Sequence, residues 1–220
     1  MKKTENMKYL KAYEKIRDLI LSGKKLPGTR LVLADLEAEL QIGRGALREA
    51  LLRLDRSGLV RNIPYKGAVV ASPPKQKEIE YIYKMRADIE VELALVAMER
   101  MDDSDFTELE NIYGEMVKLK STNEGFFALD RQFHLYIAEK SDMSHLYSVL
   151  EKLLEFIEMF LSLYQYKSND CVRFNEEHAQ IVSALREKNA EVLAEVLSAN
   201  IRGGLGLVGE AYDRIRCSTE

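Results

Sequence analysis

The stretch GRGALREALLRLDRSGLV (43–60) decides the fold of the amino-terminal part of the chain. Its apolar residues recur at steps of three and four, which predicts an amphipathic helix with one buried face. These residues are Leu47, Ala50, Leu51 and Leu54. Arg44 and Arg48 stand one turn apart on the opposite face, so we expect both arginines to point outward.

The sequence on either side completes a small domain. Apolar steps predict a first helix that ends near Ser22 and a short second helix around Leu36. After the third helix, two β-rich runs at 59–63 and 68–71 flank the turn PYKG (64–67), which predicts a hairpin. Three short helices followed by a hairpin predict a winged helix-turn-helix.

Charge divides the 220-residue chain at the same place. Residues 1–72 carry 15 Lys+Arg against 8 Asp+Glu, a net charge of +7, whereas residues 73–220 carry 17 against 28, a net charge of −11. The pair Pro73-Pro74 continues neither a helix nor a central strand. We therefore predict a basic domain over 1–72, a linker over 73–77 and an acidic domain over 78–220.

Composition excludes several classes of protein. The chain is 46% hydrophobic and 31% charged, which is typical of a globular protein and not of a disordered one. It contains no apolar run long enough for a membrane span and no apolar signal segment at its start. Its two cysteines, Cys171 and Cys217, offer no disulfide framework. These features predict a cytoplasmic protein.

The exposed arginines of the third helix favour duplex DNA as the partner. A helix fits the major groove, where arginine donates two hydrogen bonds to guanine and neutralises phosphate. Gly45, between the two arginines, allows a close approach of the backbone to the groove wall. The alternative is a solvated face on which Arg48 pairs with Glu49 or Asp55.

The acidic part is predicted to be entirely helical. After residue 78 one apolar stripe at helical spacing follows another, and the last three predicted helices cover about 145–165, 176–187 and 189–213. This pattern indicates a bundle of six or seven helices. The whole chain is therefore predicted to be mainly α.

Five polar residues fall on these buried stripes and predict a polar pocket in the bundle. They are Arg86, Asp130, His134, His178 and Asn200. Burying such groups without partners costs several kcal/mol each, so we expect them to meet one another or a bound ion. An aspartate and a histidine one turn apart, with a histidine from another helix, suit a transition metal. The alternative is a satisfied polar core in which Arg86 pairs with Glu90.

The basic part resembles the winged helix-turn-helix of the GntR transcription regulators. The resemblance is carried by PGTRL (27–31), the stretch 43–60 already quoted and PYKGAVV (64–70). It implies DNA contacts through Arg44 and Arg48 on the recognition helix and through Lys66 and Gly67 at the wing tip. Gly43 stands where the family usually has a serine, so a helix cap is missing.

The acidic part resembles the FCD effector domain of the FadR subfamily. The matching stretches are FALDRQFHLYIAEKS (127–141) and EEHAQIVSALREKNAEVLAEVLSANI (176–201). The resemblance implies that one aspartate and three histidines hold Zn, Ni or a similar ion. Asp130, His134 and His178 match three of these ligands, and Asn200 replaces the last histidine as a weaker fourth ligand. Arg86 is implied to bind the carboxylate of a small organic acid.

These observations predict a homodimeric, ligand-responsive transcription regulator, without enzymatic activity, that binds a double-stranded operator. A small carboxylic acid is expected to release a repressor or otherwise modulate it. Two alternatives remain open. One is a metal-dependent helical enzyme with a basic appendage, for which Glu177 is the evident general base. The other is a regulator whose pocket is only a structural polar core.

Overall fold

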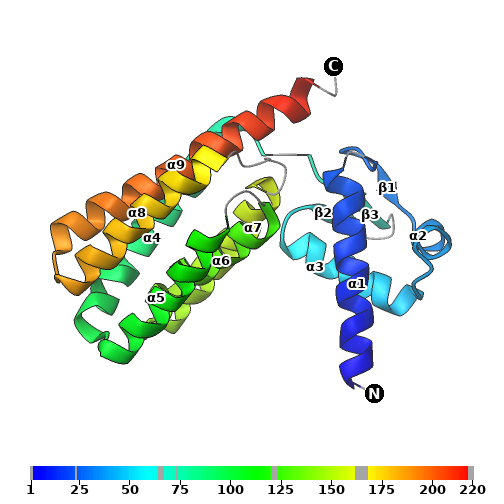
Figure 1. The fold of residues 1–220 in the computed structure, drawn as a ribbon. Coiled ribbons are helices and arrows are strands. Elements are labelled where there is room, and N and C mark those ends of the chain that lie inside the picture. Colours follow the sequence, from blue (N-terminus) through cyan, green and yellow to red (C-terminus); the bar gives the residue numbers. More distant parts are fainter. Residues whose placement is uncertain are drawn as a thin grey trace. The chain divides into compact units, whose positions relative to one another are not determined.

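A computed structural model describes residues 2–22, 24–63, 67–72, 74–119, 123–161 and 168–217. The chain divides into two compact units, Met1–Pro74 and Lys75–Glu220, and Figure 1 labels their helices and strands. Within the described ranges, no helix combines the length and the apolar character needed to cross a bilayer.

The first unit combines three helices with a small antiparallel sheet. Its elements are α1 (Lys2–Leu21), β1 (Arg30–Leu31), α2 (Leu33–Leu40), α3 (Arg44–Arg56), β2 (Val60–Ile63) and β3 (Gly67–Val70). The expected hairpin of β2 and β3 is present, and β1 adds a third strand in the order β1-β3-β2. Arg30 and Arg61 both pair with Val69, from opposite sides of β3.

The quoted stretch forms α3, and its predicted apolar face is buried. Leu47, Ala50 and Leu54 are fully enclosed, and Ile16 of α1 is enclosed with them. Gly58, at a φ of 80° in the left-handed region, follows α3 and turns the chain into β2. Burial of one face of α3 therefore leaves its opposite, arginine-bearing face at the surface.

The second unit is a helical bundle, as expected. The described residues form α4 (Gln76–Arg100), α5 (Asp103–Lys118), α6 (Asn123–Glu139), α7 (Ser144–Leu161), α8 (Ser168–Arg186) and α9 (Ala190–Cys217). Helix α4 packs against α6, α7 and α9, while α8 packs against α5 and α9 (Figure 1). The predicted polar residues lie on four of these helices, α4, α6, α8 and α9.

Two glycines in α9 allow its close packing against neighbouring helices. A Cβ atom on Gly203 would lie 3.2 Å from Phe174 Cε1 of α8, and one on Gly204 would lie 3.3 Å from Tyr83 Cε1 of α4. Such contacts are tighter than ordinary van der Waals distances, so α9 approaches α4 and α8 where it has no side chains. This close packing lies one turn beyond Asn200.

Candidate functional site

The predicted recognition residues lie on the exposed face of α3. Arg44, Gly45 and Arg48 are all exposed, and the space beside Gly45 is open. Arg44 Nε lies 2.6 Å from Glu37 Oε2 of α2, with both side chains well exposed. Among the described residues Arg48 has no ion pair, so the alternative pairing with Glu49 or Asp55 is not present.

A cavity of about 320 Å³ lies beside this face. Its lining consists of Arg30, Leu31, Val32, Leu33, Arg48, Leu51, Leu52, Asn62, Gly67 and Ala68. The structure thus brings together Arg48 of α3 and Gly67, the first residue of β3, which has a φ of 86°. Lys66, the other predicted wing residue, lies outside the described residues.

Sequence reasoning missed two polar residues of this cavity, Arg30 and Asn62. Arg30 belongs to the quoted PGTRL stretch, but a two-residue strand is too short for alternation to reveal it. Its pairing with Val69 of β3 places it beside Gly67.

In the second unit the predicted polar residues converge in one buried cluster. Asp130 and His134 lie one turn apart on α6, and His178 comes from α8. His178 Nε2 lies 3.2 Å and His134 Nε2 lies 3.8 Å from Asp130 Oδ1. Both histidines are almost fully buried, and Asp130 retains 18% of its side-chain exposure. We call Asp130, His134 and His178 the Asp–His–His cluster.

Glu90 of α4 links this cluster to Arg86. Glu90 Oε1 accepts a hydrogen bond from Arg86 Nε at 2.6 Å, and Glu90 Oε2 lies 2.6 Å from His134 Nδ1. The pairing of Arg86 with Glu90, one of the alternatives above, is therefore present. The contact of Glu90 with His134 was missed, although the spacing of Tyr83, Arg86 and Glu90 on one buried stripe marks Glu90 as a core-facing residue.

The charges of these groups support one another. Burial works to raise the pKa of Asp130, but its contact with His178 and the charges of His134 and Arg86 prevail and lower that pKa to about 2. The pKa of Glu90 is lowered to about 2 in the same way, because Arg86 and His134 outweigh burial. The pKa of Arg86 is raised, since Glu90 and Asp130 outweigh its burial. Two carboxylates therefore stay ionised in the interior of the bundle.

The donor set of the cluster fits a divalent metal ion. One ligand atom from each of Asp130, His134 and His178 lies within 4.8 Å of the others. Ligands of a tetrahedral first-row ion are about 3 to 3.5 Å apart, so small side-chain movements suffice to close the site. None of the four ring nitrogens makes a well-formed hydrogen bond within the described part of the chain. His134 Nδ1 and His178 Nε2 do lie beside the carboxylates of Glu90 and Asp130, and a metal ion would supply the partner that the other two ring nitrogens lack among the described residues.

Asn200, the predicted weak fourth ligand, is buried on α9, and its amide nitrogen forms a hydrogen bond. Its Nδ2 atom donates a hydrogen bond to Glu177 Oε2 at 3.0 Å. Glu177 also lies 3.7 Å from Arg173 Nε. The amide nitrogen of Asn200 is therefore engaged by the residue that precedes His178.

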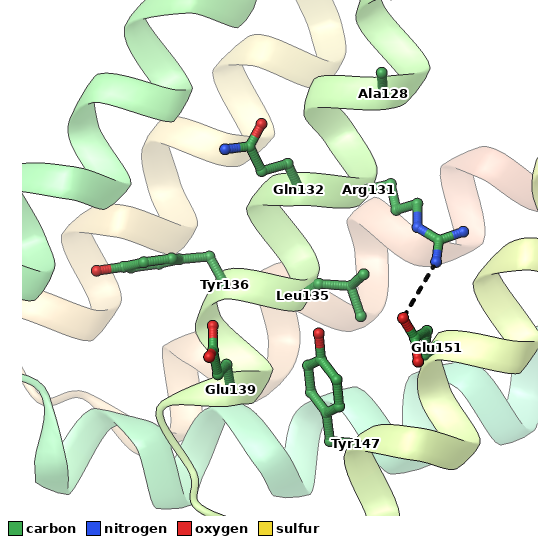
Figure 2. A pocket seen from close by; sticks show the side chains of 8 residues that line it. All are labelled: Ala128, Arg131, Gln132, Leu135, Tyr136, Glu139, Tyr147 and Glu151. Atoms are coloured by element: carbon green, nitrogen blue, oxygen red, sulfur yellow. Dashed lines mark ion pairs between the residues drawn. The ribbon is translucent and has the colours of Figure 1, made fainter. Parts of the chain in front are cut away.

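Figure 2 shows a second, larger cavity, an open groove of about 440 Å³ between α6 and α7. Arg131 and Glu151 point toward one another across it, with Nη2 and Oε1 3.8 Å apart. Tyr147 stands between Glu139 and Glu151, and burial together with these carboxylates raises its pKa. No predicted site residue lines this groove, because Asp130 and His134 lie on another face of α6.

Both units match models of known protein families. Residues 8–70 match the model described as bacterial regulatory proteins, gntR family, and residues 81–203 match the FCD domain. Each matched segment lies within one of the two compact units described above.

Two relatives match most of this chain over most of their own length. The transcriptional regulator McbR of Escherichia coli is 26% identical over 198 residues, which cover 87% of this chain and 88% of the relative. LutR of Bacillus subtilis is 26% identical over 203 residues, which cover 83% of this chain and 93% of the relative.

Solved structures share the fold. The structure titled E. coli McbR/YncC superposes with a TM-score of 0.73 at 22% identity, covering 93% of this chain and 98% of that one. The structure of Lar, from Listeria monocytogenes, gives a TM-score of 0.69 at 16% identity and covers 94% of this chain and 96% of that one. With these matches along nearly its whole length, the chain belongs to the GntR family of bacterial regulatory proteins and is a transcriptional regulator with an FCD effector-binding domain.

Proposed function

We propose that this regulator reads duplex DNA through α3, with Arg44 and Arg48 as the residues that contact bases or phosphates and Gly45 as the point of close approach. The observation that carries the proposal is the exposed arginine stripe on a helix whose other face is buried. Arginine in the major groove forms paired hydrogen bonds with guanine. Gly67 at the start of β3 and Lys66 before it supply the second contact.

The regulator acts as a homodimer in the cytoplasm. A single α3 reads only a few base pairs, and two-fold symmetric dimers double the contact by binding two half-sites of a palindrome. The net charge of +7 on residues 1–72 supplies attraction to phosphates. An operator is therefore expected to be a short palindrome whose half-sites are one helical turn apart.

The Asp–His–His cluster is the sensing site. Asp130, His134 and His178 would hold a divalent ion such as Zn or Ni, with Asn200 as a weak fourth ligand. A bound ion supplies positive charge that attracts the carboxylate of a small organic acid. Arg86, whose charge acts on Asp130, adds to that attraction. An acid bound there alters DNA affinity only by favouring one of two arrangements of the protein, and release of a repressor is the expected outcome.

The cluster serves binding rather than catalysis in this proposal. Relatives of full length are named as transcriptional regulators. Glu177, the residue that could act as a general base, is engaged by Asn200 and lies close to Arg173. A turnover screen with added metal therefore gives no activity that depends on His178.

Selection of bound fragments from random duplex DNA tests the DNA-binding part. The full-length protein is expected to enrich one palindromic motif at moderate salt. A variant with both Arg44 and Arg48 changed to alanine should enrich none, whereas Arg56→Ala, an exposed arginine at the other end of α3, should enrich the same motif. Absence of any enriched sequence with the wild-type protein would overturn the proposal.

Metal analysis of the purified protein tests the sensing part. We expect about one divalent ion per chain, its loss in His178→Ala, and its retention in His145→Ala, which removes an exposed histidine outside the cluster. Small carboxylic acids should raise the melting temperature of the metal-loaded protein. Equal metal content in both variants would show that the cluster is a structural polar core.

A further inference from the structure

We propose that the cavity between α3 and the sheet of the first unit seats a phosphodiester group of the bound DNA. Arg30 and Arg48 supply its positive charge, and the side-chain amide of Asn62 supplies a hydrogen-bond donor. This inference rests on the proposed DNA binding and adds a phosphate site, with two residues that sequence reasoning had not assigned.

The place of the cavity follows from the dimensions of DNA. A helix with its side chains is about 10–12 Å in diameter, and the major groove is about 12 Å wide. A phosphodiester strand therefore runs along each flank of a helix that enters the groove. The cavity opens on one flank of α3, between Arg48 and the start of β3 at Gly67, which is where such a strand passes.

Arg30 and Arg48 both line this cavity. Arg30 is exposed on β1, and its Nε atom lies 3.9 Å from the position that a Cβ on Gly67 would take. Within the described residues neither Arg30 nor Arg48 forms an ion pair, in contrast to Arg44 with Glu37. Two uncompensated guanidinium groups on one cavity favour an anion between them.

Asn62 adds a side-chain donor that lacks an acceptor within the described part of the chain. Its backbone N–H donates to Asp55 Oδ1 at 2.8 Å, which ties β2 to α3 beside the cavity. Its side-chain Nδ2 is buried and has no hydrogen-bond partner among the residues described. A buried donor without a partner destabilises the protein, and a phosphate oxygen that accepts its hydrogen bond would remove this cost.

The remaining walls suit the sugar that accompanies a phosphate. They are aliphatic, and Leu52 and Val32 stay 46% and 39% exposed although they belong to a compact domain. Deoxyribose presents C–H groups that pack against such side chains. A volume of about 320 Å³ also exceeds that of a bare phosphate, which leaves room for the sugar.

The salt dependence of DNA binding tests the site. For a duplex that the wild-type protein binds, the slope of log affinity against log salt concentration should fall in magnitude by about 0.9 in Arg30→Ala, the contribution of one phosphate contact. Affinity should fall to the same degree for the selected sequence and for an unrelated one, because a phosphate carries no base identity. Arg30→Lys should restore most of the slope.

Two further variants keep the test specific. Arg61→Ala removes an exposed arginine that also pairs with Val69 but does not line the cavity. Its slope should lie closer to that of the wild type than the slope of Arg30→Ala does. Asn62→Leu should weaken binding roughly tenfold through the lost donor, without a change of slope. Circular dichroism and melting temperature confirm that each variant is folded.

The outcomes separate this inference from the function on which it rests. If the wild-type protein binds no duplex at any salt concentration, the proposed function itself fails. If the wild-type protein binds DNA but Arg30→Ala keeps the full slope, or Arg61→Ala lowers it equally, the phosphate site is wrong and DNA binding stands.

Discussion

The side-chain amide of Asn200 donates a hydrogen bond to Glu177, with Nδ2 and Oε2 3.0 Å apart. Asn200 lies on α9 and Glu177 on α8, so this bond ties two helices together beside His178. It engages the amide nitrogen of Asn200, whereas an amide binds a metal ion through its oxygen. Asp130, His134 and His178 are therefore the three strong candidate ligands of the cluster, and the amide oxygen of Asn200 is the weak fourth ligand that we propose.

Asn200→His is expected to raise the affinity for Zn or Ni. An imidazole is a better ligand than an amide for these ions, and position 200 lies on a helix adjoining α8. The expected gain is about tenfold or more, since even residues behind the ligands change metal affinity by about 10- to 100-fold. Competition with a chelator measures it.

The control for this change adds the same side chain elsewhere. Asn111→His places an imidazole on the exposed face of α5, outside the cluster, and should leave the affinity at the wild-type value. If Asn200→His titrates like Asn111→His, position 200 does not face the metal.

Glu90→Gln is expected to destabilise the helical unit by about 3–5 kcal/mol. Glu90 is the partner of the buried Arg86, and removing one member of a buried ion pair leaves the other charge uncompensated. The contact with His134 is weakened as well. Unfolding in urea, followed by circular dichroism, measures the difference.

Glu99→Gln provides the matched comparison on the same helix. Glu99 is 66% exposed and lies 3.7 Å from Lys188, so its loss should change the free energy of unfolding by less than about 0.5 kcal/mol. Equal stability of the two variants would contradict a structural role for the Arg86–Glu90 pair.

The sequence predicts most helices of this chain because their apolar stripes are long and regular. It places the start of α8 too late, at about residue 176 instead of Ser168. The early part of that helix is polar at Ser168, Asn169 and Asp170, but Cys171 and Phe174 are buried and hold it in the bundle. Tertiary packing thus overrides a local pattern that is typical of a loop.

Contacts between helices are harder to predict than the helices. Asp130 and His134 are four residues apart on α6, and this spacing places them on one face of the helix. The contact of Glu90 with His134 joins α4 to α6 and depends on how the two helices pack. The same holds for Arg30, which reaches the cavity beside α3 through pairing of β1 with β3. Neither relationship has a fixed sequence spacing.

Arg44→Ala and Arg48→Ala are each expected to weaken binding to the selected operator by about 1–3 kcal/mol, the usual worth of a paired contact with guanine. Both side chains are exposed, so the fold of either unit should not change. Fluorescence anisotropy with labelled duplex measures the loss. Unaltered binding by both variants would remove the assignment of α3 as the recognition helix.

Glu37→Gln is expected to tighten DNA binding a few-fold. Glu37 holds Arg44 in an ion pair at 2.6 Å, and this pair competes with any phosphate or base for the guanidinium. Because both side chains are exposed, the pair adds little to folding stability. The same anisotropy assay measures the change at one fixed salt concentration.

The control is Glu39→Gln on the same helix. Glu39 pairs with Lys25 at 2.9 Å and not with a predicted DNA contact, yet its substitution removes the same negative charge. Glu37→Gln should therefore tighten DNA binding more than Glu39→Gln does. Equal effects would mean that net charge alone, and not release of Arg44, accounts for the gain.

Gly204→Ala and Gly206→Ala are expected to change stability in opposite directions. Alanine is favoured over glycine within a helix by up to about 1 kcal/mol, and the space beside Gly206 is open, so Gly206→Ala should stabilise the unit. At Gly204 the new Cβ would lie 3.3 Å from the Tyr83 ring, which is buried and can move little. Overpacking there should cancel the gain and lower the melting temperature. If thermal unfolding shows equal stabilisation by both, α9 does not pack as closely on α4 as the structure indicates.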